Sequence, residues 1–248
     1  MDGFTLAVAQ FRPVAGDIGW NTRRHVRLIK RAIEANAKMI IFPELSLTGY
    51  ELELAEKLAF SADDVRLNIF RELADQFGIT IIVGAPVWQQ SGKVGIGLLI
   101  FRPNCATSTY CKMHLHAGEN EIFAQGEEEL VFDCGGESIG LAICADTANS
   151  VHAANIAGKG ATIYLCSMLI TANGYAEDTR ILSEYARQYK MLVAMANYYG
   201  ETGGWSAIGQ SGIWNGTGAL IGQAGIETEG LVVGVKKNGV WNAETIDC

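Results

Sequence analysis

Short aliphatic and β-branched runs alternate with helical patterns along the first half of the chain. The runs lie at residues 4–11, 39–42, 79–84 and 97–101, and each is predicted to be a strand. Between the first two runs, residues 21–37 place Val26, Ile29 and Ile33 at three- and four-residue spacing, which predicts an amphipathic helix. Strands that alternate with helices are typical of a layered α/β fold.

A second helix is predicted at residues 63–77, where every fourth residue from Val65 to Phe77 is apolar and Gly78 follows as a C-cap. The alternation continues in the second half, with strands predicted at residues 138–144, 161–166 and 191–196 and helices at residues 152–158 and 177–190. Dense glycines from Gly200 onward indicate turns between short strands near residues 219–221 and 231–235.

The composition favours one domain over residues 1–248. The chain is 49% hydrophobic and 19% charged, which supplies one large core, and no proline-rich linker, repeat or low-complexity block divides it. Lysines and arginines number 19 against 27 aspartates and glutamates, so the formal charge is -8. Such a surface repels phosphate backbones and anionic membranes, and we expect no nucleic-acid or membrane partner.

The six cysteines are scattered without a CxxC pair or a disulfide framework. This usage fits a reducing compartment, and the chain shows neither a basic region ahead of an apolar leader nor an apolar run of about 20 residues. We therefore expect a cytoplasmic protein.

Three polar residues stand where predicted strands end. Cys144 closes the run at residues 138–143, a position at which a strand-to-helix turn can expose a thiol beside free backbone N–H groups. Glu44 follows the apolar run at 39–43, and desolvation there would favour a general base. Lys112 could stabilise an oxyanion as a fixed cation. Each also has a simpler interpretation, namely packing for the cysteine, a cap or turn for the glutamate and an exposed edge for the lysine.

Two histidines follow the lysine. Alternation along residues 110–116 would place Lys112, His114 and His116 on one side of a strand. A pair of histidines two residues apart, without a third ligand at a telling spacing, is a weak zinc signal, so no metal is predicted.

These residues lie in segments that resemble, in order, the three motifs of the nitrilase (carbon-nitrogen hydrolase) superfamily. The segments are Phe-Pro-Glu-Leu at 42–45 with Thr-Gly-Tyr at 48–50, Tyr-Cys-Lys-Met-His-Leu at 110–115, and Gly-Leu-Ala-Ile-Cys-Ala-Asp at 140–146. Flanking matches are Ala-Val-Ala-Gln-Phe at 7–11, Gly-Ala-Pro at 84–86, Val-Ala-Met-Ala-Asn at 193–197 and Gly-Gln-Ser-Gly-Ile at 209–213. The resemblance therefore covers nearly the whole chain.

The resemblance implies an αββα sandwich of the nitrilase type, paired into a homodimer or a higher dimer-based oligomer, with a Glu44-Lys112-Cys144 triad. On this interpretation Cys144 forms a thioester with the substrate, Glu44 moves the protons, and Lys112 with the backbone N–H of Ala145 holds the oxyanion. No cofactor or metal is needed. A second glutamate of the family matches Glu119, seven residues before Gly126, and Glu121 is the rival candidate.

The departures from the family pattern concern the substrate. After the nucleophile the chain reads Cys-Ala-Asp-Thr-Ala-Asn at 144–149, without the arginine and proline of many members or the Cys-Trp-Glu of many nitrilases. We therefore expect an amidase acting on a small linear amide, with N-carbamoyl amides second and nitriles third. Asn149 and Met168 are candidate substrate contacts. The alternatives are a catalytically silent scaffold homologue and a papain-like hydrolase with His114 as base.

Overall fold

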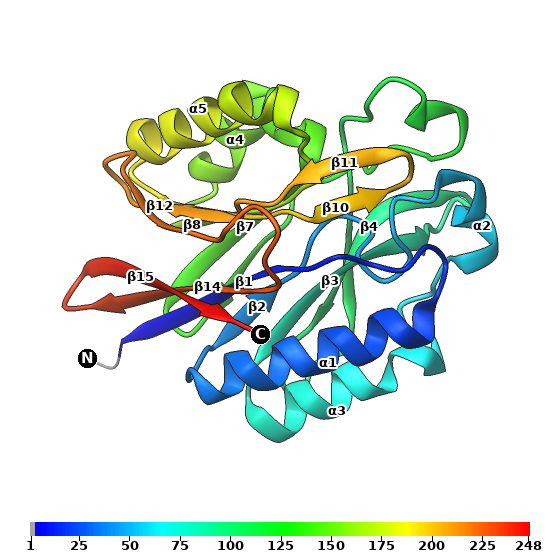
Figure 1. Cartoon of the computed structure of the whole chain (residues 1–248), viewed down its shortest axis with the longest axis horizontal. Coiled ribbons are helices and arrows are strands. Elements are labelled where there is room, and N and C mark those ends of the chain that lie inside the picture. Colours follow the sequence, from blue (N-terminus) through cyan, green and yellow to red (C-terminus); the bar gives the residue numbers. More distant parts are fainter. Residues whose placement is uncertain (1–2) are drawn as a thin grey trace.

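The computed structural model describes residues 3–248, which form two β-sheets facing each other with helices on both outer sides (Figure 1). The first sheet has the order β15-β14-β1-β2-β3-β4-β5. Its strands are β1 (Phe4–Gln10), β2 (Met39–Ile41), β3 (Thr80–Trp88), β4 (Val94–Phe101), β5 (Ser108–Cys111), β14 (Gly230–Lys237) and β15 (Val240–Asp247). The inner strands β1, β2 and β3 are parallel, and β14 returns antiparallel to β1.

The second sheet has the order β13-β12-β9-β8-β7-β6, with β7, β8 and β9 parallel. Its strands are β6 (Val131–Cys134), β7 (Glu137–Ile143), β8 (Ile163–Ser167), β9 (Leu192–Ala196), β12 (Gly212–Trp214) and β13 (Leu220–Gln223). A separate hairpin is formed by β10 (Tyr199–Thr202) and β11 (Trp205–Ile208).

The helices cover the outer faces of both sheets. Helices α1 (Ile18–Glu34) and α3 (Asn68–Phe77) lie beneath the first sheet in Figure 1, and α4 (Ser150–Gly158) and α5 (Ala172–Tyr189) lie above the second. A short α2 (Ala55–Leu58) lies beyond the edge of the first sheet. The hydrophobic core has three layers, because apolar side chains fill the space between the sheets and the space under each helical layer. This confirms the predicted αββα sandwich.

The predicted faces of the first two long helices are partly wrong. In α1 the buried side chains are Asn21, His25, Leu28, Ile29 and Ala32, so only Ile29 of the predicted stripe is fully buried. Val26 and Ile33 flank the contact face. The helix starts three residues earlier than predicted because the side chain of Asp17 accepts from the backbone N–H of Trp20.

The segment predicted as one helix at 63–77 begins with a separate 3-10 turn (Val65–Leu67), because the Asp64 carboxylate accepts from the backbone N–H of Arg66. Val65 is consequently 77% exposed, and α3 buries Phe70, Leu73 and Ala74 against the sheet while Phe77 stays exposed. Gly78 does cap the helix, with φ +64° in the left-handed region.

Most of the strands that the apolar pattern missed lie at a sheet edge or in the hairpin, and the exception is β12, which lies between β13 and β9. The missed strands are β6, β10, β11, β12 and β15. In β15 intermediate and exposed positions alternate, so its sequence carries little hydrophobic signal. Among residues 3–248, no helix combines the length and the apolar character needed to cross a membrane.

Candidate active site

Glu44 lies just beyond the carboxyl end of β2, in a turn that is buried in the core. Its backbone carbonyl accepts a hydrogen bond from the Tyr198 hydroxyl, and the next residue, Leu45, has φ +53°. The side chain is fully buried. One carboxylate oxygen, Oε1, accepts from Nζ of Lys112 at 2.7 Å. The other, Oε2, is buried without a hydrogen-bond partner in the described part of the chain.

Lys112 directly follows β5, and its side chain is also fully buried. Its ammonium donates to Glu44 Oε1 at 2.7 Å and to Glu119 Oε1 at 2.8 Å. Because an ammonium has three N–H donors, a third remains after these two bonds. Burying this cation is tolerable because two carboxylates surround it.

Glu119 is the second glutamate of the cluster, whereas its rival Glu121 is exposed. The Tyr50 hydroxyl donates to Glu119 Oε1, and the backbone N–H of His116 donates to Oε2 at 2.6 Å. These contacts fix Glu119 against the ammonium of Lys112. The predicted strand over residues 110–116 is only partly correct, because β5 contains Tyr110 and Cys111 but ends there.

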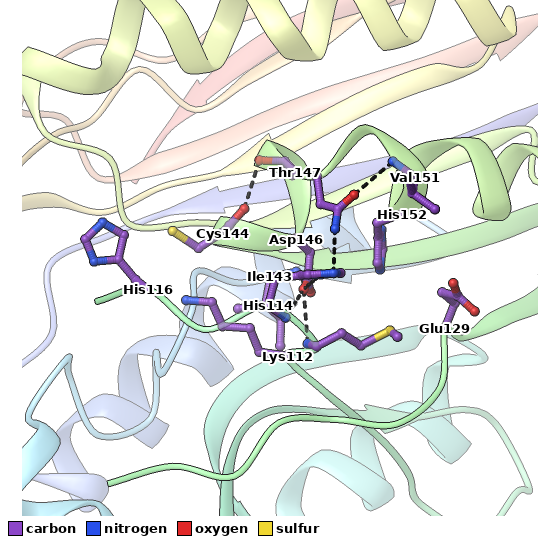
Figure 2. Close-up of polar contacts among 12 residues, drawn as sticks. Lys112, His114, His116, Glu129, Ile143, Cys144, Asp146, Thr147, Val151 and His152 are labelled. Atoms are coloured by element: carbon purple, nitrogen blue, oxygen red, sulfur yellow. Dashed lines mark hydrogen bonds and ion pairs between the residues drawn. The ribbon is translucent and has the colours of Figure 1, made fainter. Parts of the chain in front are cut away.

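Cys144 begins a 3-10 turn (Cys144–Ala148) at the end of β7. Its φ of +42° is rare for a residue with a side chain, and such strain concentrates at functional positions. The carbonyl of Cys144 accepts from Oγ1 of Thr147 at 2.8 Å. Figure 2 shows the sulfur and the Lys112 ammonium on the same side of the site. Ala145 is the second residue of the turn, where backbone N–H groups lack partners within the helix.

Asp146 is a buried carboxylate that sequence reasoning missed, although it stands only two residues after the cysteine. It accepts from the backbone N–H of Ile143 at 3.0 Å, of Met113 at 3.0 Å and of His114 at 2.8 Å, and from the Tyr110 hydroxyl at 2.6 Å. These bonds tie the segment that carries Lys112 to the turn that carries Cys144 (Figure 2).

His114 and Asn149 belong to this network. His114 places Nδ1 3.1 Å from Asp146 and Nε2 2.7 Å from the amide of Asn149. Asn149 also caps α4 by accepting from the N–H of Val151 at 3.0 Å, and it is not among the residues that line the cavity beside Cys144. A substrate contact at Asn149 stays a prediction. In residues 3–248, no group of three His, Cys, Asp or Glu side chains is arranged to hold a metal ion.

A cavity of about 330 Å³ opens beside Glu44 and Cys144, which is the size of a small-ligand site. Ala145, the predicted oxyanion residue, and Met168, a predicted substrate contact, are among the residues that line it. The lining also contains Tyr50 of the first motif and side chains that no sequence pattern singled out, and the latter include Thr171, Asp178 and Trp205.

Burial and neighbouring charges shift the pKa values of Glu44, Cys144 and Lys112. Burial raises the pKa of Glu44 to about 7, against the opposing effect of Lys112. Burial and the nearby Glu44 carboxylate raise the pKa of the Cys144 thiol to about 12. For Lys112, burial lowers the pKa, but Glu44, Cys144 and Glu119 more than offset it, and the pKa lies above its usual value. A neutral thiol, a carboxyl that titrates near neutrality and a fixed ammonium therefore share one site.

The chain belongs to the carbon-nitrogen hydrolase family, whose pattern it matches over residues 5–235.

Three known proteins illustrate the relationship. The glutamine-dependent NAD(+) synthetase of Acinetobacter baylyi is 31% identical over 152 residues, which cover 59% of this chain and 28% of that protein. A probable nitrilase of Schizosaccharomyces pombe is 26% identical over 243 residues, covering 92% of this chain and 86% of the relative. The amidase from Nesterenkonia sp. AN1, solved with butyramide, shares the fold with a TM-score of 0.84 at 24% identity, covering 93% of this chain and 89% of that one. The chain thus spans under a third of the synthetase but most of the other two proteins.

Proposed function

We propose that this hydrolase cleaves the C–N bond of a small linear amide through a thioester on Cys144. The observation that carries the proposal is the unequal environment of the two Glu44 oxygens. Lys112 occupies Oε1, while Oε2 is buried, unpartnered and part of a residue that lines the same cavity as Cys144. A carboxylate oxygen kept free beside a neutral thiol suits a general base.

In the first half-reaction, Glu44 Oε2 takes the proton of the Cys144 thiol as the sulfur attacks the amide carbonyl carbon. The new C–S bond pushes the carbonyl electron pair onto oxygen, where the third N–H of Lys112 and the backbone N–H of Ala145 stabilise it. When the intermediate collapses, the C–N bond breaks and the departing nitrogen takes the proton from Glu44. Ammonia leaves, and a thioester remains.

In the second half-reaction, Glu44 takes a proton from water as the water oxygen attacks the thioester carbon. The C–S bond then breaks, and the proton returns from Glu44 to the sulfur, so the product is a carboxylic acid and the enzyme is regenerated. Glu119 acts as a positioning residue for Lys112, which it contacts at 2.8 Å.

An amide is favoured over the alternatives by the relatives and by the site. One relative is named as glutamine-dependent and one structural neighbour is an amidase solved with butyramide, so both names refer to amides. N-carbamoyl amides remain second and nitriles third. A papain-like mechanism with His114 as base is disfavoured, because both of its ring nitrogens are engaged by Asp146 and Asn149. Pairing of two chains and a cytoplasmic location stay predictions from the resemblance and the cysteine usage.

The proposal is tested by ammonia release from a panel of small amides, N-carbamoyl compounds and nitriles. We expect turnover of amides, complete loss in Cys144→Ala, and a loss of about a thousandfold or more in Glu44→Gln, since proton transfer in both half-reactions then lacks its base. His114→Ala serves as the control and should retain most activity. Amide turnover that survives Cys144→Ala would refute the proposal.

A silent scaffold is distinguished by thiol alkylation. Rapid alkylation should occur at Cys144 and depend on Glu44, whereas in a scaffold Glu44→Gln would leave the rate unchanged. The exposed Cys105 provides an internal reference for an unassisted thiol.

A further inference from the structure

Asp178 places a carboxylate in the lining of the cavity that contains Cys144. It lies in α5 and is half-buried. Its charged neighbours do not neutralise it, because Arg180 donates to Glu177 and Glu184, each at 2.6 Å. Within residues 3–248, Asp178 itself has no hydrogen-bond or ion-pair partner at its carboxylate. Its carboxylate is therefore available to a ligand that enters the cavity.

Two carboxylates line the cavity. Glu44 and Asp178 do so together with the imidazole of His116, and among the described residues no lysine or arginine lines it. The nearby ammonium of Lys112 is already shared by Glu44 and Glu119. Burial and the adjacent Glu177 raise the pKa of Asp178, as expected for a carboxylate that lacks a counter-ion. Such a cavity repels a substrate with a carboxylate tail and attracts a cationic one.

Trp205 provides a second surface for a cation. It is 48% exposed, begins β11 and lines the same cavity as Asp178. The hairpin is fixed beside the start of α5, because Ile208 N–H donates to the Ile170 carbonyl at 3.0 Å and Thr171 pairs with Ala207 (Figure 1). An indole face attracts an ammonium through its electron-rich π system. A carboxylate and an indole thus face one cavity that is otherwise lined mainly by small and apolar side chains.

We propose that the substrate is a linear amide with a primary ammonium at the end opposite the scissile bond, bound by Asp178 and Trp205. This inference rests on the proposed amide hydrolysis at Cys144. The ammonium donates hydrogen bonds to the Asp178 carboxylate while the alkyl chain crosses the apolar middle of the cavity, near Met168 and Ile170. The amide carbon then reaches Cys144.

The test compares three amides of equal length, namely δ-aminovaleramide, hexanamide and adipamic acid, whose far ends are an ammonium, a methyl group and a carboxylate. We expect kcat/KM to fall in that order, with about a tenfold advantage for the ammonium over the methyl group. In Asp178→Asn the preference for the ammonium should disappear while turnover of hexanamide is retained. The matched control is Glu177→Gln, which removes the neighbouring carboxylate from the solvent side and should leave the preference intact.

Binding to Cys144→Ala, measured by calorimetry, separates this inference from the proposed reaction. If none of the amides is hydrolysed by the intact enzyme, the proposed function fails. Tighter binding of δ-aminovaleramide than of hexanamide, lost in Cys144→Ala with Asp178→Asn, would still support the ammonium site. Equal affinity or equal kcat/KM for the ammonium and methyl compounds would overturn it, as would a preference that survives Asp178→Asn.

Discussion

At the residue scale, the proposed mechanism together with the pKa of Glu44 predicts a reaction that is sensitive to pH near neutrality. Glu44 must be ionised to accept the thiol proton, and its pKa is raised to about 7 by burial. We therefore expect kcat/KM for a neutral amide to rise with pH through about 7. Because the pKa of Lys112 lies above its usual value, the lysine should stay charged across the alkaline range. A pH profile of kcat/KM tests whether this rise occurs near pH 7.

The pH at which kcat/KM rises should depend on Glu119, whose negative charge is one cause of the raised pKa of Glu44. Glu119→Gln removes the charge, so the acid limb should move to lower pH, in addition to any loss of kcat. Glu177→Gln is the control, since Glu177 is exposed and pairs with Arg180. An unmoved limb in Glu119→Gln would show that the titrating group is not Glu44.

At the scale of elements, the turn after β2 depends on a close approach by β3. A Cβ at Gly84 would lie 2.3 Å from the carbonyl oxygen of Pro43 and 2.5 Å from the nitrogen of Leu45. Both obstacles are backbone atoms, so the turn that carries Glu44 would have to move.

We expect Gly84→Ala to lower kcat by about a hundredfold, because a displacement of about 1 Å in a catalytic group has effects of that size. The measurement is single-turnover kinetics together with the alkylation rate of Cys144. Gly158→Ala is the matched control, because a Cβ there meets nothing within 4 Å. Normal kcat in Gly84→Ala would mean that Glu44 does not need its observed position.

Some residues of the candidate site can be predicted from the sequence, and others cannot. Glu44 and Cys144 were recognisable as polar residues at the ends of buried parallel strands, and the ends of such strands define one edge of each sheet. The ordered motifs supplied Lys112 and Glu119. Asp178 was not recognisable, because its place in the cavity depends on where α5 packs, and helical periodicity alone does not reveal that.

At the scale of the whole molecule, stability rests on the apolar layer between the two sheets. Leu165 is fully buried in that layer, and Leu165→Ala should lower the free energy of unfolding by about 2–5 kcal/mol through lost burial and the cavity left behind. Val65 is 77% exposed and provides the contrast, because Val65→Ala should change the free energy of unfolding by less than about 0.5 kcal/mol. Urea unfolding followed by circular dichroism measures both. Similar losses in the two variants would contradict this assignment of the core.

The pairing of β1 with β14 joins segments that are far apart in the sequence, since Gln10 lies opposite Gly230. During synthesis the second edge of β1 therefore stays uncovered until β14 has been made. Contacts so distant in sequence form slowly, and an uncovered strand edge promotes association with other chains. A chain released before residue 230 would keep that edge open, so synthesis through β14 is a condition for the protein to remain free of aggregates.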